Sequence, residues 1–184
     1  MGLHAAPPRV AIVAPPEASA PVPEPEAATP APEPPAPEPP APLPLEAYPI
    51  ERCAAIAASL ARRKADRAAT LDQCELDEEL WEALDRHWAE AIRAAAARGK
   101  TAPLRAYDEA YVARLEAERG AITAEEYARI LVAAERGTEK EALAELGLPR
   151  GALLRVQRVW LRRMGESKDL GRRVREAVEG AREG

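Results

Sequence analysis

A pattern of 22 residues that occurs twice, in residues 71–92 and again in 143–164, constrains the fold more than any other feature of the chain. Aligned without a gap, the two copies share four identities: Leu71 with Leu143, Leu76 with Leu148, Arg86 with Arg158 and Trp88 with Trp160. Several other rows are apolar in both copies. The apolar rows recur every three to four residues, which is typical of the buried stripe of a helix. Each copy therefore predicts a helix, a tight turn and a longer helix.

Signals for helix ends support this interpretation. Asp77 is placed to cap the longer helix of the first copy, and Gly147 is placed to end the shorter helix of the second. Elsewhere, Thr123 with Glu126 and Thr138 with Glu141 have the spacing of capping boxes. The helices that we expect span residues 49–65, a short stretch after residue 66, 78–98, 103–120, 123–137, 138–147, 150–164 and 168–178.

No segment alternates as a β-strand does. We therefore predict an all-α fold: a bundle of about seven to eight helices built from a duplicated helix-turn-helix-like unit. The repeat units would span about 48–98 and 123–164, within a single helical domain formed by residues 46–184. A body of this length is sufficient for one hydrophobic core.

The N-terminal residues 1–45 have a different composition. They contain 16 of the 19 prolines, together with many alanines and glutamates, and so offer little apolar surface for a core. We expect a disordered, proline-rich arm. Near its start lies a small apolar patch formed by Val10, Ile12 and Val13, which is either part of that disordered end or a motif that docks onto a partner's sheet edge.

The charge is unevenly distributed. The chain has a net charge of −5, yet residues 149–184 carry ten basic and five acidic side chains. Such polarity favours electrostatic docking with a partner. The two cysteines, Cys53 and Cys74, lack the paired spacing of zinc or redox sites, and we predict neither a metal nor a cofactor. Because no apolar run reaches the length of a membrane span or a signal-peptide core, we expect no membrane association and a cytoplasmic location.

Residues 141–160 also match the apolar and glycine rows of a DNA-binding helix-turn-helix, with five arginines close by: Arg150, Arg155, Arg158, Arg162 and Arg163. Two features weaken this interpretation. Leu143 occupies a row that usually holds a small residue, and the first copy is acidic, so it would repel phosphate. Arg155, Arg158 and Arg162 are predicted on the face opposite the core stripe. They form a solvated surface, a stripe that docks protein, or a nucleic-acid contact.

The sequence gives little support to catalysis. His87 falls beside Trp88 at the border of a helical stripe, where a structural imidazole is the simpler interpretation. There is no nucleophile motif and no glycine-rich phosphate loop. We therefore expect that the protein is not an enzyme.

Three short segments carry a resemblance: Tyr-Ala-Arg at 127–129, Glu-Arg-Gly at 135–137 and Arg-Val-Trp at 158–160. Over about residues 46–178 the chain resembles a group of uncharacterised all-helical proteins from high-GC bacteria, some encoded alongside type VI secretion components. The resemblance implies an accessory or adaptor role and assigns no active-site residue. We predict a non-enzymatic module that binds a protein partner through Arg155, Arg158, Arg162 and Arg150. The alternative is a nucleic-acid-binding protein that uses residues 141–160.

Overall fold

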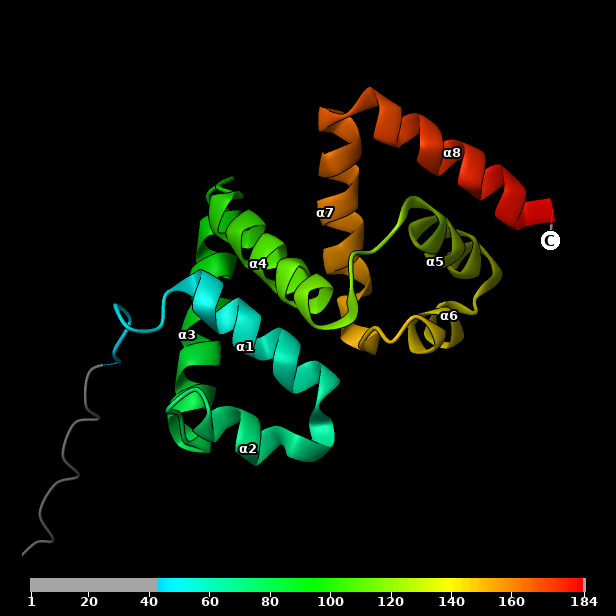
Figure 1. The fold of residues 1–184 in the computed structure, drawn as a ribbon. Coiled ribbons are helices and arrows are strands. Elements are labelled where there is room, and N and C mark those ends of the chain that lie inside the picture. Colours follow the sequence, from blue (N-terminus) through cyan, green and yellow to red (C-terminus); the bar gives the residue numbers. More distant parts are fainter. Residues whose placement is uncertain (1–42, 184) are drawn as a thin grey trace, which may run out of the picture. The chain divides into compact units, whose positions relative to one another are not determined.

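Helices account for most of residues 43–183, the part of the chain that this computed structural model describes (Figure 1). The eight α-helices are α1 (Ile50–Arg62), α2 (Arg67–Asp72), α3 (Glu78–Ala97), α4 (Ala102–Arg119), α5 (Ala124–Arg136), α6 (Glu139–Glu145), α7 (Leu153–Glu166) and α8 (Lys168–Glu183). Two short 3₁₀ helices, η1 (Lys64–Asp66) and η2 (Arg150–Ala152), precede α2 and α7. These residues contain no β-strand, so the all-α prediction is confirmed.

The two halves of the described chain share part of their helix packing. The first helix packs most extensively against the fourth: α1 against α4, and α5 against α8. In each half the short second helix, α2 or α6, contacts the first, while α4 and α7 join the two halves. This arrangement is what a duplicated unit would produce, and the duplication itself remains a prediction. The predicted repeat units of 48–98 and 123–164 omit α4 and α8.

The tight turns of the two 22-residue copies have the same backbone geometry. Leu76 N–H donates to the Leu71 carbonyl at 3.0 Å, and Leu148 N–H donates to the Leu143 carbonyl at 2.8 Å. Both are the long hydrogen bond of a Schellman motif, which requires a left-handed residue just before its donor. Gly147 fills that position in the second copy, at φ 64°, as its sequence predicts. A glutamate, Glu75, fills it in the first copy, at φ 60°.

Two of the three predicted caps are present. The Asp77 carboxylate accepts the Leu80 N–H at 2.7 Å, and Thr123 with Glu126 forms a reciprocal capping box. The capping box predicted for Thr138 and Glu141 is wrong, because the Thr138 side chain makes no cap hydrogen bond. Thr138 follows the left-handed Gly137, so its own N–H and hydroxyl both donate to the Ala133 carbonyl, at 2.8 and 3.4 Å, and complete the end of α5.

Two hydrophobic clusters form the core. The smaller lies among α1, α2 and α3, and the larger takes side chains from α1 and from α4 through α8. Trp160 belongs to the larger cluster and stacks on Tyr127, with ring centroids 4.7 Å apart. Trp88 is half-buried, packs against both clusters and donates its indole N–H to the Tyr48 carbonyl at 3.1 Å. Trp160 therefore belongs to the larger cluster, whereas Trp88 contacts both clusters.

The described residues begin just before the predicted domain boundary at residue 46. Leu43 and Leu45 are partly buried against the smaller cluster, so the packed body takes in side chains on the arm side of that boundary. The predicted disordered arm otherwise lies outside the described residues, as do Val10, Ile12 and Val13. Within residues 43–183, no helix combines the length and the apolar character that crossing a bilayer requires.

Candidate functional site

The arginines of α7 contact α4, although their position opposite the core stripe predicted a solvated face. Arg158 donates two hydrogen bonds to the Asp108 carboxylate, at 2.6 and 2.9 Å. Arg162 forms a salt bridge with Glu109 at 2.5 Å. Asp108 is fully buried, and its hydrogen bond raises the pKa of Arg158 further. These two arginines therefore hold α7 against α4 and are not free charges.

Arg155 is also held within the molecule. Its guanidinium lies over the rings of Tyr107 and Tyr111, 5.4 and 4.6 Å from their centroids, and it donates to the Gly151 carbonyl at 2.8 Å. Burial raises the pKa of Tyr107 to about 12 and also raises that of Tyr111, and the positive charge of Arg155 only partly offsets this effect. Both phenols are therefore neutral near pH 7, and Arg155 is bound through cation–π contact.

Arg150 differs from the other three predicted contacts. It lies in η2, is exposed, and forms no salt bridge within residues 43–183. Of the four arginines predicted to bind a partner, the structure therefore leaves one with its charge uncompensated by a nearby carboxylate.

The outer face of α7 exposes two leucines. Leu154 and Leu161 are each 63% exposed, and they are the large hydrophobic side chains that stand out from the surface of the described chain. Leu161 follows Leu154 by seven positions, so the two lie two turns apart on one face of the helix. We call this pair the α7 leucine strip. Exposed leucines aligned on one helix face are typical of a surface that another protein covers.

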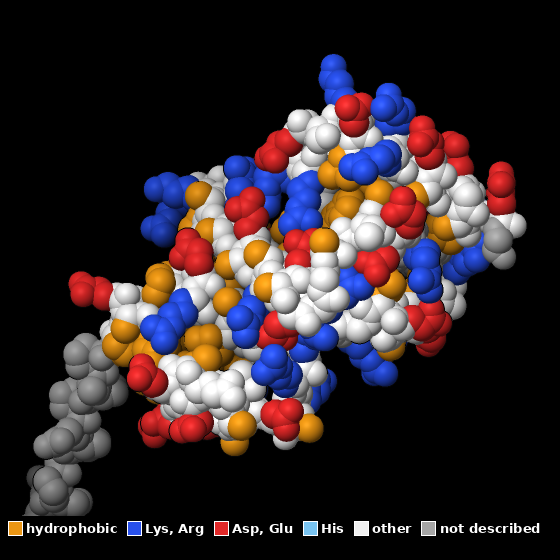
Figure 2. Space-filling view, viewed as in Figure 1, with side chains coloured by type: hydrophobic (Ala, Val, Ile, Leu, Met, Phe, Trp, Pro, Cys, Tyr) orange, Lys and Arg blue, Asp and Glu red, His pale blue; other side chains and the backbone are white. Residues whose placement is uncertain are grey.

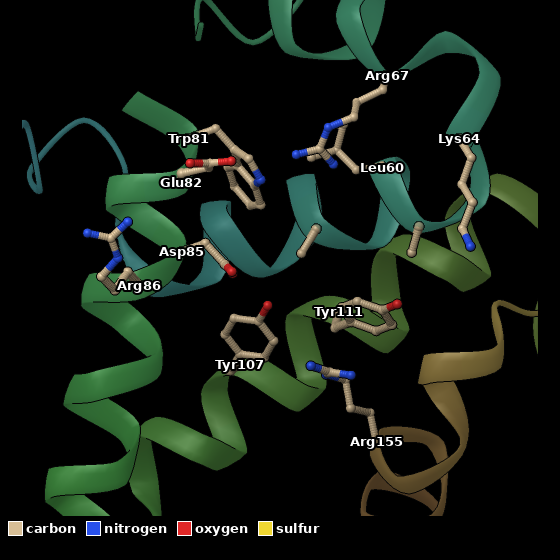
Figure 3. Close-up of a pocket in the computed structure, with 12 residues that line it drawn as sticks. Leu60, Lys64, Arg67, Trp81, Glu82, Asp85, Arg86, Tyr107, Tyr111 and Arg155 are labelled. Atoms are coloured by element: carbon tan, nitrogen blue, oxygen red, sulfur yellow. The ribbon is translucent and has the colours of Figure 1, made fainter. Parts of the chain in front are cut away.

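A groove of about 930 Å³ opens between α1, α3 and α4, with Arg155 of α7 at its edge (Figure 3). Its floor is apolar, formed by buried side chains of three helices: Leu60, Trp81, Tyr107 and Tyr111. The hydroxyl of Tyr107 points toward Asp85 of α3 in this view. Because these aromatic side chains are almost fully buried, the floor offers little aromatic surface to a ligand.

Charges of both signs surround this floor. Lys64, Arg67, Arg86 and Arg155 supply cations, while Glu82 and Asp85 supply carboxylates from α3. Arg67 is paired with Glu78. The rim of the groove is therefore mixed in sign. Figure 2 likewise shows acidic and basic side chains interspersed over the face in view, without an extended area of one sign.

The residues considered for catalysis occupy structural positions. His87 packs edge-on against Trp88, with centroids 5.1 Å apart, and does not line the groove. Cys53 is buried, and burial raises the pKa of its thiol to about 11, so it stays protonated near pH 7. Within residues 43–183, no three potential ligands among His, Cys, Asp and Glu converge on a common point.

Comparison with known proteins finds no matching family model, no similar curated protein and no similar solved structure. The resemblance to helical bacterial proteins thus stays a prediction.

Sequence reasoning missed Asp108 and the α7 leucine strip. Asp108 lies on the apolar face of α4, four residues after Leu104, and a lone carboxylate at such a position signals a buried ion pair. Leu154 and Leu161 lie off the core stripe that contains Val156. Two leucines that lie outside the core stripe and seven positions apart indicate an exposed apolar helix face.

Proposed function

We propose that the protein is a non-enzymatic protein-interaction module that binds an amphipathic helix of its partner on the α7 leucine strip. The observation that carries this proposal is the exposure of Leu154 and Leu161 on one helix face. Burying two leucine side chains contributes about 3 to 6 kcal/mol before the costs of association, which is sufficient for a central anchor of a helix-in-groove contact.

Four exposed basic side chains of this region form no salt bridge within the described residues and leave positive charge for an acidic partner: Arg150, Lys168, Arg173 and Arg175. Residues 149–184 have ten basic and five acidic side chains, whereas the chain as a whole is acidic. An amphipathic helix with carboxylates beside its apolar face would complement this region, and such complementarity selects partners and speeds encounter. An antiparallel pair of copies would place two basic segments together, which argues against self-association through this face.

Nucleic-acid binding by residues 141–160 stays the alternative proposal. It would need α7 to enter a groove of the duplex with its cations toward phosphate. However, Arg158 and Arg162 face carboxylates of α4, Arg155 is held over two tyrosines, and the outward positions Leu154 and Leu161 are apolar. These contacts support the protein-binding proposal over this alternative.

A photo-crosslinking residue placed at Leu154 or at Leu161 of the full chain tests the proposal. We expect both positions to crosslink the same protein, and a control position at the exposed Ala94 of α3 not to do so. The double variant Leu154→Ser/Leu161→Ser should bind that protein at least about tenfold more weakly, because each lost leucine contact is worth more than 1.4 kcal/mol.

Undiminished affinity of the double variant would refute the assignment. Crosslinks to nucleic acid, together with affinity that falls steeply with salt, would instead favour the alternative. The identity of the crosslinked protein also tests the expected accessory role beside a secretion system.

A further inference from the structure

A second hollow lies where the end of α1 and η1 meet the turn that leads from α6 into η2, and it shares Ala61 and Lys64 with the edge of the groove. It has a volume of about 600 Å³, and its charged lining residues are all cations: Arg62, Lys64 and Arg150. The remaining lining comes from Ala61 and from the turn at residues 147–149 with Gly151. We call this the basic hollow. Its lining contains no carboxylate from the described residues, unlike the rim of the groove in Figure 3.

The neighbouring carboxylate does not neutralise this charge. Glu118 of α4 faces three guanidinium groups at once: Arg114 at 2.9 Å, Arg62 at 3.7 Å and Arg63 at 3.8 Å. It also accepts the Ser59 hydroxyl at 2.7 Å. One negative charge is thus shared by three positive charges, and the cations of the basic hollow remain in excess.

Arg62 itself is incompletely bonded. Its Nη1 is buried and has no hydrogen-bond acceptor among the described residues, since Glu118 lies beyond hydrogen-bond distance. A buried donor without an acceptor is rare and costs free energy, and this one faces Glu118, whose single charge Arg62 shares with two other arginines. The hollow therefore presents cationic side chains whose charge is not fully compensated.

We propose that the basic hollow binds a phosphoryl group. A phosphate dianion matches a site with several cations and no carboxylate, and a guanidinium presents two parallel donors to its oxygens while an ammonium supplies a point charge. Two glycines in the turn also leave room beside the main chain, because a Cβ added at Gly147 or Gly151 would meet no atom within 4 Å. A ligand can thus approach the backbone there.

The proposal is independent of the α7 leucine strip, since neither Leu154 nor Leu161 lines the hollow. The phosphoryl group would come from a small phosphorylated molecule or from a nucleic-acid backbone, because both offer the same oxygens. A nucleic-acid backbone would bring a duplex to the site, whereas a small phosphorylated molecule would not.

The test is a titration of the isotope-labelled full chain with inorganic pyrophosphate at constant ionic strength, followed by amide chemical shifts. We expect the largest shifts at residues 61–64 and 147–151. Lys64→Gln/Arg150→Gln should weaken pyrophosphate binding at least about tenfold, because it removes two of three charge-assisted contacts. Both side chains are exposed and without a salt bridge in the described chain, so the fold is retained. Arg98→Gln/Lys100→Gln removes equal charge elsewhere and should have no effect.

Two results would overturn the proposal: equal weakening by both double variants, or shifts that spread over the surface without a maximum at the hollow. A second arm adds a short DNA duplex to the pyrophosphate complex. Displacement of pyrophosphate with shifts at the same residues identifies a nucleic-acid backbone as the source, and retention of pyrophosphate identifies a small phosphorylated molecule. Leu154→Ser/Leu161→Ser should leave pyrophosphate binding unchanged, which separates this site from the proposed partner surface.

Discussion

At the scale of single residues, the ion pair between Asp108 and Arg158 is the most consequential contact. Among residues 43–183, Asp108 is the one charged residue that is fully buried, with 2% of its surface exposed. The Arg158 side chain, in contrast, has 41% of its surface exposed to solvent. A buried charge without a partner is strongly destabilising, while an exposed guanidinium that loses its partner is rehydrated. Loss of the arginine should therefore destabilise the fold more than loss of the carboxylate.

This inequality predicts different costs for removing each partner. Arg158→Met should lower the free energy of unfolding by about 3 kcal/mol, because it leaves the Asp108 carboxylate buried with only the more distant Arg155, at 4.0 Å. Asp108→Asn should cost about 1 kcal/mol, because Arg158 can turn to water. Urea unfolding of both variants measures the difference. Equal costs, or a greater cost for Asp108→Asn, would contradict this account.

Sequence alone could not supply this contact. Fifty positions separate the two residues, and they meet only because α4 packs on α7. The arginine spacing on α7 was read correctly as one face of a helix. The packing of α4 beside that face depends on the tertiary structure, so a local pattern does not show that these arginines, while partly exposed, pair with carboxylates of α4.

At the scale of elements, the two equivalent turns differ in how well their residue suits the backbone. Glu75 and Gly147 hold the same left-handed position, which costs an L side chain about 1 kcal/mol or more and costs glycine nothing. Glu75 is exposed and forms no salt bridge among the described residues, so little is lost when its side chain is removed.

We therefore expect Glu75→Gly to stabilise the protein by about 0.5 to 1 kcal/mol, because strain relief outweighs the added freedom of the unfolded chain. Gly147→Ala, the matched change in the other turn, should destabilise by about 1 kcal/mol, since a Cβ meets no clash there and only the backbone strain remains. Thermal unfolding would detect shifts of a few degrees in opposite directions. A loss of stability in Glu75→Gly would show that the glutamate is not strained.

The two threonines at helix starts give a second matched comparison. The Thr123 hydroxyl accepts the Glu126 N–H at 3.2 Å, whereas the Thr138 hydroxyl donates to a carbonyl of the preceding helix at 3.4 Å. Thr123→Ala should cost about 1 kcal/mol, the usual worth of a cap, and Thr138→Ala less than about 0.5 kcal/mol. Urea midpoints measure both. Equal losses would mean that Thr138 does cap α6 in solution.

The order of the helices could be predicted because the residues that start and end helices act locally. Asp77, Thr123 and Gly137 act within a few residues of themselves, so their effects can be read from the sequence. The prediction for Thr138 is wrong because this residue belongs to two overlapping motifs, the end of α5 and the start of α6. Its hydroxyl bonds to the end of α5. The groove and the basic hollow each join helices that are distant in the chain, which no local pattern encodes.

At the scale of the whole molecule, carboxylates held by arginines link stability to pH. Burial opposes ionisation of Glu118, but the Ser59 hydroxyl and the arginines Arg114, Arg63 and Arg62 outweigh it and lower its pKa. The hydrogen bond from Arg119 lowers the pKa of Glu126. A carboxyl group whose folded pKa lies below its unfolded value of 4.5 stabilises the fold above that pH, and this contribution is lost as the pH falls through the folded pKa.

The loss of folding stability at acid pH should therefore depend on Glu118. Glu118→Gln removes the titrating group but retains an acceptor for the Ser59 hydroxyl. The variant should therefore be less stable than the parent protein near pH 6. Between about pH 5 and pH 3 the variant should lose less stability than the parent protein does. The two urea midpoints should converge in acid, because protonated Glu118 no longer attracts its three arginines. Urea unfolding across this range measures the convergence, with Glu90→Gln, at an exposed carboxylate without a salt bridge among the described residues, as the control. A constant gap between variant and parent at every pH would show that Glu118 stabilises the fold through its hydrogen bond and packing alone.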